Sequence, residues 1–148
     1  MLQWFISALV MIVQKYGYEN VYRITDYKNP FDSYKGQDVI LFEEFRSSVT
    51  ITEILDWTDI HPCELRARYT NKVACYTKVY FCSNIDLRQQ YRHIQEEEPE
   101  SWNAFLRRIN NVMVMVDGNS MTYPTEEYLK DEWFFLTDDQ MKYIPFDL

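Results

Sequence analysis

Glycine is scarce in this sequence: the 148 residues contain only Gly17, Gly36 and Gly118. The common phosphate-binding loop is rich in glycine and ends in Gly-Lys-Thr or Gly-Lys-Ser, so that backbone amides and the lysine surround the phosphates. None of the three glycines can form such a loop. The sequence therefore argues against a self-sufficient nucleotide hydrolase of the phosphate-loop type.

Cysteines, histidines and long apolar runs are also few. The apolar run at residues 2–13 is too short to span a bilayer, so we expect a buried helix there and no membrane partner. The three cysteines lack disulfide spacing, which indicates a reducing, intracellular compartment. A zinc site would have to be built from Cys63, Cys75, Cys82, His61 and His93, but no CxxC or HxxxH pair occurs. We therefore expect the cysteines to be buried in strands as small apolar residues.

Positive charge is in deficit but unevenly placed. The net charge of -8 argues against bulk attraction to nucleic acid. Residues 117–148 hold eight acids and two bases, whereas Glu64–Tyr80 holds four bases and one acid. From the residues alone, an exposed strand face is the simpler interpretation of this basic segment, which contains Arg66, Arg68, Lys72 and Lys78.

Hydrophobic patterns predict alternating strands and helices. We expect strands at 20–25 and 38–42, the second covered on both faces because its apolar run is continuous. Thr50 and Glu53 have capping-box spacing before a helix. A hairpin with its turn at residues 70–72 should precede a core strand that ends at Asn84, and "QEEEPE" should be a solvated loop.

The later segments complete the predicted fold. Pro99 suits the first turn of a helix, and "NVMVMV" (111–116) reads as a last core strand. The fold class is therefore α/β, with a mostly parallel central sheet flanked by helices. We expect one domain at 1–116 and an acidic, aromatic extension at 117–148.

Two carboxylates, Glu43 and Glu44, come directly after the strand at 38–42. The carboxyl ends of parallel strands border the crevice where α/β sheets bind ligands, and acids there can hold magnesium and orient water. A solvated strand end is the simpler explanation of this motif alone. A metal-dependent nuclease or phosphatase is a further alternative, which needs more carboxylates, with Asp26 and Asp32 nearest in sequence.

The ordered set "DVILFEEF", "KVYFCSN" and "FLRRI" resembles the ATPase domain of superfamily 3 helicases. The resemblance is to the C-terminal domain of rolling-circle replication initiator (Rep) proteins of small circular DNA viruses and related plasmids. It covers residues 15–116, including "GYENVYRITDYKNPFDSYKGQDVILFEEF" and "RYTNKVACYTKVYFCSN". It implies a P-loop NTPase (AAA+)-like core with a basic β-hairpin, incomplete at its N-terminus, where Ser7, Ala8 and Leu9 occupy the positions of the phosphate loop.

The resemblance implies a role for each matching residue. Glu43 would lie nearer the magnesium ion and Glu44 would orient the attacking water. Both acids would belong to the metal site. Asn84 would be the polar sensor of the ATP γ-phosphate. Arg107 or Arg108 would act across a subunit interface on a neighbour's nucleotide. Lys72, in the hairpin turn, would hold a nucleic-acid strand together with Arg66, Arg68 and Lys78.

The implied function is that of a ring-forming, ATP-driven motor which unwinds DNA or RNA strands in replication. Its cofactors would be ATP and magnesium, although without the loop we expect a fragment with impaired ATP binding. Its partners would be single-stranded nucleic acid and other subunits, either identical copies or a full-length initiator. No nicking activity is expected, since the required His-x-His pair is absent.

One alternative stays open. A nucleotide-blind module could instead oligomerise or bind single strands, and so modulate a full-length initiator. The location would be the host nucleus for a virus, or the cytoplasm for a plasmid or bacterium.

Overall fold

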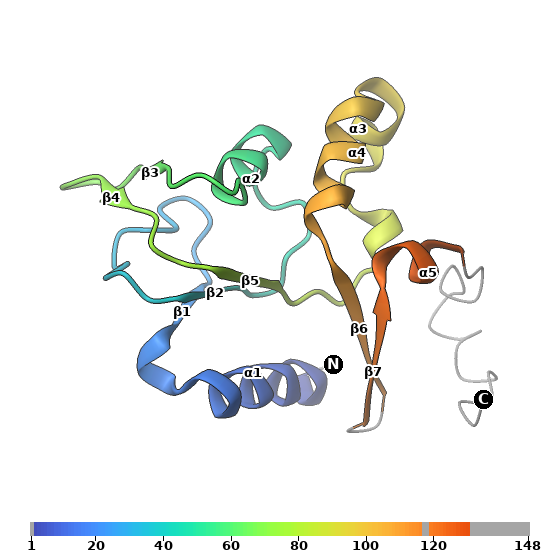
Figure 1. Cartoon of the computed structure of the whole chain (residues 1–148), viewed down its shortest axis with the longest axis horizontal. Helices are drawn as coiled ribbons and strands as arrows, with labels where there is room; N and C mark the ends of the chain where they lie inside the picture. The colour runs from blue at the N-terminus through green and yellow to red at the C-terminus, as the bar shows by residue number, and fades with distance from the viewer. Residues whose placement is uncertain (1, 117–118, 131–148) are drawn as a thin grey trace.

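A small parallel sheet forms the centre of the molecule (Figure 1), in a computed structural model that describes residues 2–116 and 119–130. Its strands are β1 (Val21–Ile24), β2 (Val39–Phe42) and β5 (Lys78–Phe81), in the order β1-β2-β5. Both pairings are parallel. The expected α/β class with parallel strands is therefore confirmed, although the parallel sheet has three short strands.

Strand β2 is buried along its whole length, as its continuous apolar run predicts. Side chains alternate between the two faces of a strand. Val39 and Leu41 pack against Ile12 of α1 (Leu2–Tyr16), which crosses one face. Ile40 and Phe42 belong to the larger core cluster on the other face, which includes residues of α2 (Ile51–Trp57) and α4 (Pro99–Arg108).

Helix α1 ends where the sequence predicts. Gly17 takes a φ of 86°, and its backbone N–H donates to the Val13 carbonyl at 2.8 Å. This left-handed backbone suits glycine, because it has no Cβ to clash. The 3₁₀ turn η1 (Tyr18–Asn20) then leads into β1. Ile12 is buried but Val10 is exposed, so the expectation of a buried helix holds for one face only.

The capping box of α2 is also confirmed. The Glu53 backbone N–H donates to the Thr50 hydroxyl at 3.3 Å, and the Thr50 N–H donates to the Glu53 carboxylate at 3.1 Å. Two backbone donors that lack partners inside the helix are thereby satisfied. The cap fixes the point at which the loop after β2 becomes helical.

The hairpin after α2 differs from the predicted one. Strands β3 (Glu64–Leu65) and β4 (Lys72–Val73) pair antiparallel, and residues 66–71 connect them. The prediction that Lys72 lies in the turn is wrong, because Lys72 pairs with Leu65 within the ladder. A tight two-residue turn needs residues that accept positive φ, such as Asn-Gly, and this segment has no glycine.

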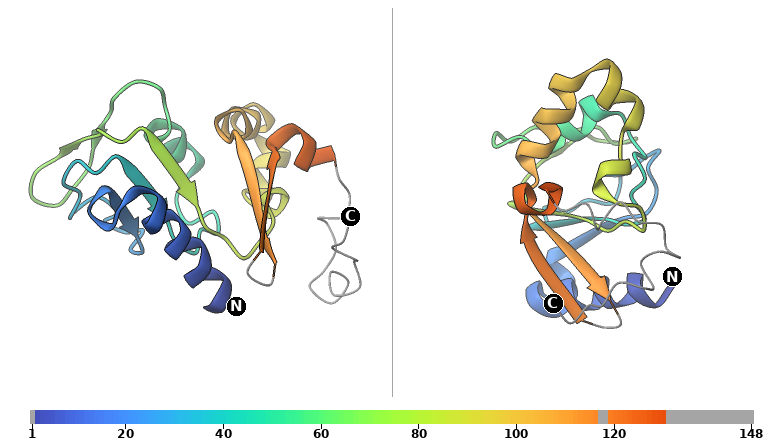
Figure 2. Two further views of the ribbon diagram at one scale, coloured as in Figure 1. Left: turned by 60° about the horizontal axis from the view of Figure 1, so that its bottom comes forward. Right: turned by 90° about the vertical axis from the view of Figure 1, so that its right-hand side faces the viewer.

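The segment at 111–116 was predicted to be a last core strand, but it does not join the parallel sheet. It forms half of a separate hairpin. Strand β6 (Asn111–Val116) pairs antiparallel with β7 (Asn119–Pro124), and the hairpin stands beside the sheet (Figure 2). Local pairing with the next segment avoids the entropy cost of closing a long loop. Helix α5 (Thr125–Lys130) follows β7, so the boundary predicted after residue 116 falls between paired strands.

The remaining elements connect β5 to this hairpin. They are η2 (Leu87–Gln89), α3 (Arg92–Glu97) and α4, which begins at Pro99 as predicted. The acidic "QEEEPE" segment (95–100) was predicted as a loop, but it forms the end of α3 and the start of α4, with Glu98 between them. No helix in the part of the chain that the structure describes is long and apolar enough to cross a membrane.

The Thr50 cap yields a stability prediction. Thr50→Ala should lower the free energy of unfolding by about 1 kcal/mol, because it removes the hydroxyl that accepts from the first turn of α2. Urea titration followed by circular dichroism measures this change. Thr52→Ala is the matched control, since Thr52 lies exposed in the same turn. Equal stability of the two variants would contradict the assigned cap.

Candidate functional site

The candidate site lies at the carboxyl ends of two neighbouring strands. Phe42 of β2 pairs with Phe81 of β5. The ladder continues past both strands, because the Cys82 N–H donates to the Phe42 carbonyl and the Phe45 N–H donates to the Cys82 carbonyl, both at 2.8 Å. Glu43, Glu44 and Asn84 therefore follow two adjacent strands at one edge of the sheet.

Glu43 is buried and ion-paired. It is 5% exposed, and its Oε1 accepts a hydrogen bond from Arg23 Nε at 2.6 Å. Arg23 lies on the adjacent strand β1, and this hydrogen bond is the largest cause of the raised pKa of its guanidinium. The Tyr27 hydroxyl donates to the Glu43 carbonyl. A magnesium ion at Glu43 would have to share this carboxylate with a cation already present.

Glu44 has a different environment from its neighbour. It is exposed and its φ is 49°, in the left-handed region that a side chain disfavours. Within residues 2–116 and 119–130, no group of three or more His, Cys, Asp or Glu side chains is placed to hold a metal ion. The two consecutive acids thus differ in burial and in backbone conformation.

Asn84 is connected to the loop that follows β2. Its Oδ1 accepts from Arg46 Nε at 2.9 Å, and it makes further interactions. Arg46 comes two residues after Glu44 and was not among the predicted site residues. A planar guanidinium beside Asn84 adds positive charge to the edge where the acids lie.

Gln90 joins the two strand-end loops, and sequence reasoning missed it. It is 3% exposed, and its Oε1 accepts from the Ser47 backbone N–H at 2.7 Å. Its Nε2 donates to the Phe45 carbonyl and to the Ser83 hydroxyl, each at 3.1 Å. A lone glutamine carries no motif. Once folded, it holds the loop of Glu44 against the loop of Asn84.

The two arginines at the end of α4 have different surroundings. Arg108 donates to Asp59 Oδ2 at 3.3 Å and to the Ala104 carbonyl at 3.2 Å. The pKa of Asp59 is lowered, first by the His61 backbone N–H and then by Arg108. Arg107 is exposed. None of the hydrogen bonds and ion pairs of the described residues joins either arginine to Glu43 or Glu44.

The four predicted nucleic-acid-binding residues do not form one set. Arg68 donates to Asp32 through Nε and, at 2.9 Å, through its backbone N–H. Lys78 pairs with Asp38 at 3.2 Å and its Nζ lies 5.6 Å from the centre of the Tyr16 ring. The structure therefore leaves Arg66 and Lys72, near the hairpin loop, as the two without an ion pair among the described residues.

The surroundings of Asp32 and Asp38 lower the pKa of both carboxylates. The pKa of Asp32 is lowered, first by the Arg68 backbone N–H and then by its guanidinium. The pKa of Asp38 is lowered, first by the Thr77 hydroxyl and then by Lys78. Both carboxylates therefore stay ionised to a lower pH than an unpaired aspartate does.

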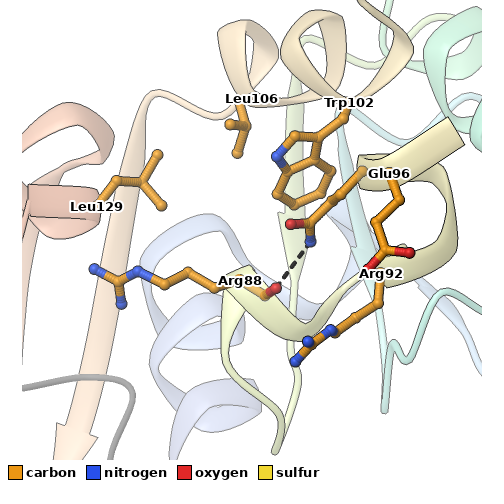
Figure 3. Close-up of a pocket in the computed structure, with 7 residues that line it drawn as sticks. Arg88, Arg92, Glu96, Trp102, Leu106 and Leu129 are labelled. Atoms are coloured by element: carbon orange, nitrogen blue, oxygen red, sulfur yellow. Dashed lines mark hydrogen bonds between the residues drawn. The ribbon is translucent and has the colours of Figure 1, made fainter. Parts of the chain in front are cut away.

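A separate hollow of about 380 Å³ lies between α3, α4 and α5 (Figure 3). Trp102 and Leu106 face Arg88 across it. The Arg88 guanidinium lies 4.9 Å from the centre of the Tyr128 ring, and Gln95 Nε2 donates to the Arg88 carbonyl at 2.8 Å. None of the predicted site residues lines this hollow.

No protein-family model matches the chain, and no curated protein matches it. The assignment of the edge therefore depends on the chemistry of its residues and on the resemblance in the sequence.

The Arg23–Glu43 pair predicts a stability effect. Arg23→Met should lower the free energy of unfolding by roughly 2 kcal/mol, because Glu43 would remain buried without its partner. The partial exposure of Arg23, 43% for its side chain, keeps the cost below that of a fully buried pair. Urea titration gives the value.

Two further variants test the cause. Glu44→Gln should change stability by less than about 0.5 kcal/mol, since this acid is exposed. Arg23→Met combined with Glu43→Leu should recover part of the loss, because no charge is then buried. A double variant less stable than Arg23→Met alone would argue against an uncompensated charge as the cause.

Cys82 gives a chemical test of burial at the same edge. Burial, with the nearby Glu43 charge, raises the pKa of its thiol to about 11, so the thiol stays protonated near neutral pH. The cysteines were expected to be buried in strands, but none of the three lies within a strand, Cys63 and Cys82 are partly buried, and Cys75 is exposed. Iodoacetamide at neutral pH should therefore alkylate Cys75 well before Cys82, as mass spectrometry of peptides would show.

Denaturant provides the control for this alkylation. In urea both thiols should react at similar rates, because burial no longer separates them. Faster modification of Cys82 in the native protein would contradict its placement.

Proposed function

We propose that this chain is a superfamily 3 helicase ATPase-like domain of a replication initiator, with impaired nucleotide binding. The observation that supports it best is the edge at which Glu43, Glu44 and Asn84 follow the adjacent parallel strands β2 and β5. A P-loop NTPase-like core places its metal-binding acids and its polar sensor on neighbouring strand ends, because both must reach the same phosphate. Gln90 and Arg46 keep the two loops together.

The residues present do not fit a complete ATP and magnesium site. Ser7, Ala8 and Leu9 stand where the resemblance places the phosphate loop, and they lie inside α1. Backbone N–H groups within a helix donate to carbonyls four residues earlier, so they are not available to surround phosphates. Arg23 also engages Glu43. The chain therefore cannot bind nucleotide in the usual manner of the phosphate-loop class.

What the domain retains is the capacity to contact nucleic acid and other subunits. Arg66 and Lys72 lie at a hairpin loop that projects from the body (Figure 1). The exposed Arg107 is the better placed of the two α4 arginines to reach a neighbour, since Arg108 is held by Asp59. We propose single-stranded nucleic acid, and copies of itself or of a full-length initiator, as partners.

A second candidate is favoured by the Arg23–Glu43 pair. An arginine that neutralises the metal-binding acid suits a nucleotide-blind module, whose role is to bind single strands or join a ring of intact initiators. The two candidates share their partners and differ in whether any hydrolysis remains.

Phosphate release and strand binding together test the proposal. With ATP and magnesium, the chain should release phosphate no faster than Glu44→Gln, with or without single-stranded DNA, because phosphate contacts are missing. It should nevertheless bind a fluorescein-labelled single strand of DNA or RNA, as fluorescence anisotropy measures. Arg66→Ala with Lys72→Ala should weaken that binding, whereas Lys35→Ala, in another loop, is the control.

The outcomes separate the candidates. Phosphate release that Glu44→Gln abolishes would show a working motor and overturn the impairment. Absence of both release and strand binding would argue against a helicase-type domain altogether.

A further inference from the structure

Tyr69 is a large aromatic residue without cover. It lies in the loop at residues 66–71 between β3 and β4, and it is 91% exposed. Folding normally buries much of a tyrosine ring, because the ring carries a large apolar surface. Within the described residues, none of the close ring pairs involves Tyr69. Its ring face is therefore open to a ligand.

The loop that carries Tyr69 is held in place by contacts of the preceding residue, Arg68. The Arg68 backbone N–H donates to Asp32 Oδ1 at 2.9 Å, and its side chain pairs with the other oxygen of Asp32. Asn71 Nδ2 donates to Glu64 Oε1 at 3.1 Å, which ties the far side of the loop to β3. Because these contacts already order the loop, binding through Tyr69 loses less conformational entropy than binding through a free loop.

Charge at the loop selects the kind of ligand. Arg66 is exposed and Lys72 is partly exposed, and they lie three residues before and three residues after Tyr69 in the sequence. Of the four bases in Glu64–Tyr80, Arg68 and Lys78 pair with Asp32 and Asp38, so among the described residues Arg66 and Lys72 are the cations of this segment left for a ligand. An exposed aromatic ring with cations nearby in the same hairpin suits a single strand, because cations hold phosphates while the ring stacks on a base. A duplex keeps its base faces stacked inside, so it cannot offer one to the ring.

We propose that Tyr69 stacks on an unpaired base of a single strand whose neighbouring phosphates contact Arg66 and Lys72. This inference rests on the proposed strand binding and adds the base itself to what is recognised. Arg68 was predicted to bind nucleic acid together with Arg66 and Lys72. In this proposal it instead holds the loop in place through its contact with Asp32.

Two probes distinguish stacking from charge. One is a fluorescein-labelled strand of thymidines, and the other is an abasic strand of equal length with the same phosphates. Tyr69→Ala should weaken binding of the thymidine strand by about tenfold in fluorescence anisotropy, and leave the abasic strand unchanged. Tyr69→Phe should retain the binding, because the ring remains. Tyr18→Ala removes a tyrosine that is 75% exposed outside the hairpin and should have no effect.

Each other outcome overturns the proposal in a distinguishable way. Equal loss for both probes would show that Tyr69 acts through the loop or its charge and not by stacking. Unchanged binding of the thymidine strand by Tyr69→Ala would refute base contact and leave the proposed strand binding intact. If the unaltered chain bound neither probe, strand binding and stacking would both fail.

Discussion

Burial of β2 on both faces is the constraint on which the arrangement of this molecule depends. Its four side chains are covered by α1 on one side and by the α2–α4 cluster on the other. Its backbone pairs with both β1 and β5. The residue after such a strand starts inside the protein, so Glu43 cannot simply be solvated. A buried carboxylate needs a partner, and Arg23 on the neighbouring strand provides one.

The same constraint separates two consecutive acids. Glu43 continues the β2 ladder, with its N–H donating to the Ile24 carbonyl at 3.0 Å. Glu44 then leaves the ladder with a φ of 49° and is exposed. Gln90 holds the loop that follows, through Phe45 and Ser47. The edge is thus held in place by side chains that carry no recognisable motif.

Local signals explain which features were predictable. The strand at 38–42, the end of α1 at Gly17 and the Thr50 cap each depend on a few neighbouring residues. Features with distant partners were not predictable, because spacing along the chain does not encode them. Arg23 with Glu43 and Gln90 with Ser47 are such pairs, 20 and 43 residues apart. The prediction for β6 was wrong although its partner β7 is the next segment along the chain. An apolar strand pattern does not say which strand it will join.

The two halves of the proposed activity depend on separate contacts. The phosphate half needs a loop where α1 lies, and a helix there satisfies its own backbone donors. The nucleic-acid half depends on the β3–β4 loop, which Asp32 braces from the connection between β1 and β2. In the proposed function, a helix at the position of the phosphate loop would remove nucleotide contacts and would leave the separate β3–β4 hairpin in place. The brace on Asp32 and the Arg23–Glu43 pair are both contacts between groups of the protein itself, so strand binding as proposed would need no bound nucleotide.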